Sequence, residues 1–139
     1  MAARIRFLHR LCHDLDAIRA FYGEGMGFEE LSYRNDEEHG WVVFASDGLQ
    51  FMFHRWPEPL PPVAGFAWQP GDGEGTEPRT SIGVHVPEED WSATVERLRA
   101  LDADALTPEP TFRQEAYWGW TLRDPAGETV EIWYEPAAG

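Results

Sequence analysis

The chain has 139 residues, 42% of them apolar, and it carries 25 acidic side chains against 11 basic ones, for a net charge of −14. This length suits one globular domain with a core of its own, and the negative charge repels phosphate backbones and anionic headgroups, so we expect neither nucleic acid nor a membrane as a partner. Cys12 stands alone, which excludes an intrachain disulfide and a cysteine-rich zinc site, and the absence of a signal-like or membrane-spanning apolar run predicts a cytoplasmic protein.

The first half of the chain predicts one strand, one helix and three further strands. Residues 4–11 interleave charged and apolar side chains, which favours a strand. An amphipathic helix is expected to follow, capped by Asp14 and ended by the glycines after Tyr22. The three further strands are predicted at residues 28–33, 40–46 and 49–54.

Residues 57–78 are rich in proline and glycine and lack a sustained period, so they predict a linker. The linker and the residue before it carry large aromatic side chains, Trp56, Phe66 and Trp68, which water does not favour. Long loops in compact domains are often functional. We therefore expect these three side chains to cover a ligand cleft.

The second half predicts the same order of elements. A strand at residues 80–86 precedes a helix that begins after Pro87. Three strands follow, a weak one between residues 105 and 113 and stronger ones at 117–123 and 129–134. The chain thus predicts a first βαβββ module at residues 1–56, a linker at 57–78 and a second module at 79–139, joined in one structural domain.

Two segments resemble a known family. One is His13-Asp14-Leu15 through Phe21-Tyr22 with Gly25-Met26-Gly27-Phe28, and the other is the turn Leu122-Arg123-Asp124-Pro125-Ala126-Gly127 with Glu131. Both are similar to the vicinal oxygen chelate superfamily, which includes glyoxalase I, extradiol dioxygenases, fosfomycin-resistance enzymes and bleomycin resistance proteins. The resemblance implies an α+β fold in which two βαβββ modules form a curled mixed-sheet cleft.

Enzymes of that superfamily hold a divalent metal at four strand positions. By the resemblance these positions fall on Phe7, Met52, Ser81 and Glu131, of which only Glu131 can bind a hard cation. The sequence therefore predicts no metal and no cofactor. An alternative remains, because His9, His54 and His85 lie two residues from those positions on the same strand faces and could form a site with Glu131.

The aromatic content favours a planar ligand. Stacking on tryptophan and pairing with one carboxylate suit a planar, cationic molecule. The residues predicted to line the cleft are Phe7, His9, Met52, His54, Trp56, Phe66, Trp68, Ser81, His85, Trp118, Trp120, Glu131 and Trp133.

Resemblance to the bleomycin resistance branch implies a homodimer that sequesters an antibiotic or other natural product without modifying it, with two ligand sites at the shared interface. On this hypothesis the protein is not an enzyme and has no catalytic residue. The alternative is an enzyme of the same fold, a lyase, isomerase or dioxygenase. Such an enzyme would use either the shifted histidines with a metal or Glu131 as a general base.

Overall fold

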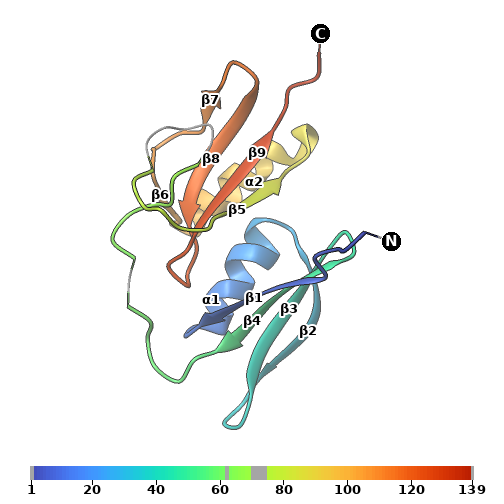
Figure 1. Cartoon of the computed structure of the whole chain (residues 1–139), viewed down its shortest axis with the longest axis vertical. Helices are drawn as coiled ribbons and strands as arrows, with labels where there is room; N and C mark the ends of the chain where they lie inside the picture. The colour runs from blue at the N-terminus through green and yellow to red at the C-terminus, as the bar shows by residue number, and fades with distance from the viewer. Residues whose placement is uncertain (1, 62, 70–74, 139) are drawn as a thin grey trace.

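The computed structural model describes residues 2–61, 63–69 and 75–138, and its first half is a four-stranded mixed sheet with a helix on one face (Figure 1). Its elements are β1 (Phe7–Cys12), α1 (Leu15–Ile18), the π-helix η1 (Arg19–Gly25), β2 (Glu29–Asn35), β3 (Gly40–Ser46) and β4 (Leu49–Arg55). The strand order is β1-β4-β3-β2, with β1 parallel to β4 and the other pairs antiparallel. Part of the predicted linker, residues 62 and 70–74, lies outside the described residues.

The second half repeats this arrangement. Its elements are β5 (Ile82–His85), α2 (Glu88–Ala100), β6 (Asp104–Ala105), β7 (Thr111–Arg113), β8 (Tyr117–Arg123) and β9 (Thr129–Tyr134). The strand order is β5-β9-β8-β6, and β7 also pairs with β8. The mixed, unclosed sheets confirm the predicted α+β class. The weak strand predicted between residues 105 and 113 is instead two short strands, because the prolines at 108 and 110 interrupt it.

The first helix differs from the regular helix that the sequence predicts. Asp14 caps it as expected, since its carboxylate accepts a hydrogen bond from the Ala17 N–H at 3.0 Å. Beyond Ile18 the helix widens into η1, where the Met26 N–H donates to the Phe21 carbonyl five residues back. Gly23 and nearby Gly25 weaken the α-helical preference of this segment. The wider turn buries the neighbours Phe21 and Tyr22 together.

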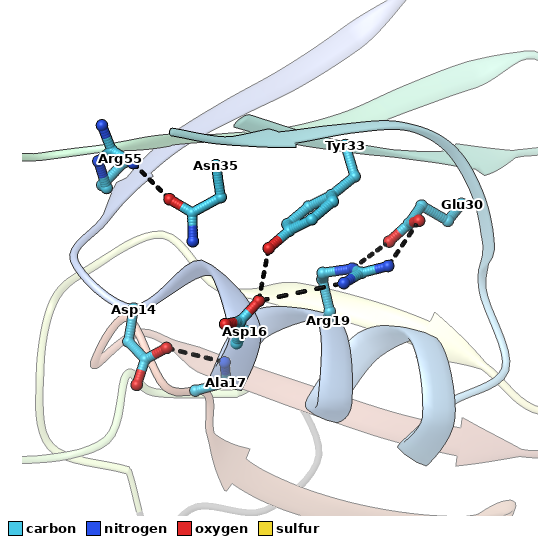
Figure 2. A network of polar contacts seen from close by, with 8 residues as sticks. All are labelled: Asp14, Asp16, Ala17, Arg19, Glu30, Tyr33, Asn35 and Arg55. Carbon is cyan, nitrogen blue, oxygen red and sulfur yellow. Dashed lines mark hydrogen bonds and ion pairs between the residues drawn. The ribbon is translucent and has the colours of Figure 1, made fainter. Parts of the chain in front are cut away.

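Polar side chains tie this helix to β2, as Figure 2 shows. The Tyr33 hydroxyl donates to Asp16 Oδ1 at 2.7 Å, and the Arg19 guanidinium lies 3.6 Å from the centre of the Tyr33 ring. Arg19 Nε also donates to Glu30 Oε1 at 2.6 Å. Ion pairs this exposed contribute little to stability. Their main effect is to fix how α1 and η1 lie across the sheet.

The helix-covered faces of the two sheets share one hydrophobic core. Buried side chains such as Phe44 and Phe53 from the first half belong to the same cluster as Leu98 and Ile132 from the second. The helices approach closely at Gly25, where an added Cβ would lie 2.9 Å from Leu98 Cδ2. Because this core occupies the helix side of both sheets, the opposite face of each sheet points away from it. We call these the open faces.

The hairpin between β8 and β9 forms the junction of the two halves. The Gly127 N–H donates to the Asp124 carbonyl at 2.9 Å and Gly127 has a φ of 88°, so the Asp-Pro-x-Gly turn predicted from the sequence is confirmed. The buried Asp124 carboxylate accepts a 2.5 Å hydrogen bond from the Tyr22 hydroxyl and pairs with Arg10 at 3.3 Å. One carboxylate thus links the first module to the second.

No helix among the described ranges is long and apolar enough to cross a membrane.

Cys12 is expected to resist alkylation in the folded protein. It is fully buried, and burial, with the nearby Asp124 and Asp14 charges, raises the pKa of its thiol to about 12. At pH 8 roughly one thiol in 10⁴ would then be ionised, against about one in four for an ordinary cysteine. Mass spectrometry after iodoacetamide treatment should show at least a roughly 1,000-fold slower reaction than in urea. Similar rates in both conditions would contradict this placement.

Candidate functional site

The open face of the first sheet gathers a pair of histidines and several apolar side chains. Parallel pairing of β1 with β4 sets His9 beside Met52 and Leu11 beside His54. Paired residues in neighbouring strands point to the same side of a sheet, and residues two apart do so along one strand. Phe7 therefore joins these four side chains on the open face. The sequence predicts Phe7 on the side of His9 and Met52 on the side of His54, and it does not predict Leu11 there. Phe7 is 59% exposed and Leu11 39%.

The two histidine rings are in direct contact. His9 Nε2 lies 2.7 Å from His54 Nδ1, and the ring centroids are 4.7 Å apart. Burial and the neighbouring His9 lower the pKa of His54. A neutral imidazole is the form that binds a metal ion, so the direction of this shift favours the form of His54 that can bind one.

The open face of the second sheet carries the other predicted polar residues. Pairing of β5 with β9 sets Gly83 beside Glu131 and His85 beside Trp133. The His85 and Trp133 rings meet edge to face with centroids 4.9 Å apart. Ser81 lies just before β5, two residues from Gly83 and half-buried. His85, Glu131 and Trp133 thus share one face, as expected from the sequence.

Glu131 is engaged in a buried ion pair that the sequence did not reveal. Arg113 Nη1 donates to Glu131 Oε2 at 2.7 Å, and the two residues are only 3% and 6% exposed. Thr121 Oγ1, at 3.1 Å, and Thr111 Oγ1, at 2.9 Å from Nε, hold the guanidinium in place. A carboxylate on a buried strand face needs a cation, but the sequence, which predicts a weak strand ending at Arg113, does not show that this arginine meets Glu131.

Two tryptophans lie on the wrong side to line a cleft. Antiparallel pairing sets Trp118 beside Tyr134 and Trp120 beside Ile132, which places both on the helix-covered face, opposite Glu131. Trp120 is 2% exposed and belongs to the core. The prediction that Trp118 and Trp120 line a ligand cleft is therefore corrected. Two of the aromatic residues predicted to stack against a sequestered drug therefore do not lie on the open face.

The linker packs on one end of the second open face. The Ala67 N–H donates to Thr129 Oγ1 at 2.8 Å, and the Arg123 guanidinium lies 4.4 Å from the centre of the Phe66 ring. Phe66 therefore docks on the second sheet. Trp56 and Trp68 remain 44% and 55% exposed.

The four metal-binding candidates are not brought together within one chain. His9 contacts His54 on the first sheet, whereas His85 contacts Trp133 and Glu131 pairs with Arg113 on the second. In the part of the chain that the structure describes, no three histidine, cysteine, aspartate or glutamate side chains are grouped to hold a metal. The described residues of one chain thus offer two converging nitrogen ligands and no third.

Comparison with known proteins identifies the fold. Residues 6–133 match the family model described as a glyoxalase-like domain. A glyoxalase/dioxygenase from Nostoc punctiforme is 21% identical, with a TM-score of 0.71 and coverage of 96% of this chain and 91% of that one. The fosfomycin resistance protein FosX from Listeria monocytogenes is 14% identical, with a TM-score of 0.65 and coverage of 99% and 94%. FosX from Mesorhizobium loti is 11% identical, with a TM-score of 0.66 and coverage of 95% and 91%.

These similarities correct the expectation that the protein is not an enzyme. Solved structures that share its fold include proteins named as a glyoxalase/dioxygenase and as FosX, and a variant of the Listeria FosX was solved with Mn(II) and 1S,2S-dihydroxypropylphosphonic acid. They place the chain in the vicinal oxygen chelate superfamily without favouring the bleomycin resistance branch. No curated protein sequence matches the chain.

Proposed function

Because the chain belongs to the glyoxalase-like domain family, we propose that it is a metal-dependent enzyme of the vicinal oxygen chelate superfamily, a lyase, isomerase or dioxygenase. The observation that carries the proposal is the 2.7 Å approach of His9 Nε2 to His54 Nδ1 on the open face of the first sheet. The superfamily's usual positions do not fit a metal here, because Phe7 and Met52 offer no suitable donor and Glu131 is paired with Arg113.

The histidine pair does fit a metal ion. Two imidazole nitrogens bound to one ion at about 2.0–2.1 Å lie roughly 3 Å apart. Binding would require that both rings turn from their mutual hydrogen bond toward the ion and that the proton between them is released. Imidazole suits zinc, nickel and iron. Such an ion, when bound, supplies a Lewis acid that polarises an oxygen of the substrate. Phe7 and Met52, on the same face, would form the apolar wall that limits access of water.

We further propose that the enzyme is a homodimer in which His85 of a second copy completes the ligand set. Catalytic sites usually have three protein ligands, and one chain offers two. His85 is exposed on the second open face, and the apolar Phe7 and Leu11 beside the histidine pair are 59% and 39% exposed. Burying such side chains against a second copy would favour association.

The proposal is tested by metal content and affinity. Purified, untagged protein is incubated with zinc, nickel, manganese or iron and then analysed for bound metal, and the competent ion is titrated into each variant. We expect stoichiometric binding of at least one ion. His9→Ala and His54→Ala should each weaken binding more than tenfold, and His85→Ala should weaken it by a similar factor. His39→Ala, in the exposed turn between β2 and β3, is the control and should leave binding unchanged.

Absence of stoichiometric metal with all four ions would overturn the proposed function. The contribution of a second copy to the metal site is tested separately. A monomer by light scattering, or an unchanged affinity in His85→Ala, would remove the contribution of a second chain.

A further inference from the structure

A groove runs between the edge strands of the two sheets, next to the histidine pair. β1 and β5 are both edge strands, and Leu8 and Ile82 face this groove from the two sides. Its volume is about 520 Å³, which is enough for a small organic molecule. The polar residues that line it are His9, Arg10, Arg79, Thr80 and Glu128. His9 therefore belongs both to the groove and to the candidate metal site.

Two arginines face this groove, and they differ in their ion-pair and hydrogen-bond partners. Arg10 is held by its 3.3 Å ion pair with the buried Asp124. The Arg79 side chain is exposed and has no hydrogen bond or ion pair within the described parts of the chain, while its backbone N–H donates to the Glu77 carbonyl. Within the described parts of the chain, the Arg79 guanidinium therefore has its N–H donors available to a ligand in the groove.

The chemistry of the arginine defines what it would bind. A guanidinium presents a planar fork of N–H donors that matches a carboxylate, phosphonate or phosphate group. Glu128 lines the same groove, so it limits the excess of positive charge there and disfavours a highly charged anion. A second, smaller cavity of about 370 Å³ continues the groove and is also lined by Arg10, Arg79 and Glu128.

We propose that Arg79, assisted by Arg10, forms an anion subsite that holds the carboxylate, phosphonate or phosphate group of the substrate beside His9. The substrate class is then a small organic anion. The reacting part of such a molecule would lie at the His9–His54 pair while its charged group lies in the groove. This identification of the ligand as a substrate rests on the proposed function, whereas the binding of an anion by Arg79 does not.

The test is calorimetric titration of inorganic phosphate into protein freed of metal by a chelator. Wild-type protein should bind phosphate in roughly the millimolar range. Arg79→Gln should weaken this binding at least tenfold, and Glu128→Gln should strengthen it severalfold because a like charge is removed. Arg4→Gln, which removes an exposed arginine near the N-terminus, changes the net charge equally and should leave the affinity within twofold.

Each outcome decides the inference. An affinity unchanged in Arg79→Gln, an equal loss in Arg4→Gln, or no binding by the wild type would overturn the anion subsite. Because the titration uses metal-free protein, it succeeds or fails independently of the histidine pair. Loss of metal binding with an intact phosphate site would leave the subsite standing and remove the proposed function.

Discussion

Replacing Arg113 by methionine is expected to lower the free energy of unfolding by about 3–5 kcal/mol. Arg113 and Glu131 are almost completely buried, and their charged atoms lie 2.7 Å apart. The substitution removes the charge opposite a carboxylate that water cannot reach. A buried charge that loses its opposite charge is far more costly than an exposed one.

Urea denaturation followed by tryptophan fluorescence measures this loss. The double variant Arg113→Met with Glu131→Met should recover stability to within roughly 1–2 kcal/mol of the wild type, because apolar replacements of a buried pair are often neutral. Arg34→Met is the matched control. Its ion pair with Asp36 is exposed and should contribute less than about 1 kcal/mol. Equal losses in Arg113→Met and Arg34→Met would show that the buried pair is not a stabilising element.

Replacing Asp124 by alanine should destabilise the protein by a similar amount, about 3–5 kcal/mol. Its carboxylate accepts hydrogen bonds from the Tyr22 hydroxyl and from the Ala126 and Glu128 N–H groups, and it pairs with Arg10. Burial raises the pKa of Asp124, and the hydrogen bond from Tyr22 opposes that rise. The carboxylate depends on these partners in a site that excludes water.

Smaller substitutions separate the contributions at this junction. Tyr22→Phe removes one hydrogen bond to a charged group and should cost roughly 1.5–3 kcal/mol by urea denaturation. In the Asp124→Ala background the same substitution should cost much less, because its acceptor is already gone. Additive losses in the double variant would contradict a direct link between the two side chains.

The regular parts of the fold could be predicted from local sequence alone. Strands β3, β8 and β9 coincide with the predicted residues, and the Asp124–Gly127 turn fixes which residues of β9 face the open side. The same turn held the information needed to place Trp118 and Trp120 correctly. It pairs Arg123 with Thr129, and following this register along β8 sets both tryptophans on the face of Ile132. The error came from leaving the register of β8 undetermined.

Other features depend on contacts between distant residues. The pairing of Arg113 with Glu131 joins β7 to β9, and no local pattern shows which of 11 basic residues meets that carboxylate. In the π-helix, Phe21 and Tyr22 are both buried in a core supplied by two halves of the chain, which a local pattern does not show. The contact between His9 and His54 likewise required the parallel register of β1 and β4.

The two open faces differ although the halves share one plan. The first displays its histidines and apolar side chains, while on the second Glu131 is held in a buried ion pair and Phe66 is docked at one end. A pair of identical, separate modules could not make this distinction, since every substitution would appear twice. Fusion into one chain breaks that symmetry. In a fused chain, substitutions can change the ligand-facing surface of one half while the buried ion pair and packing of the other half stay unchanged.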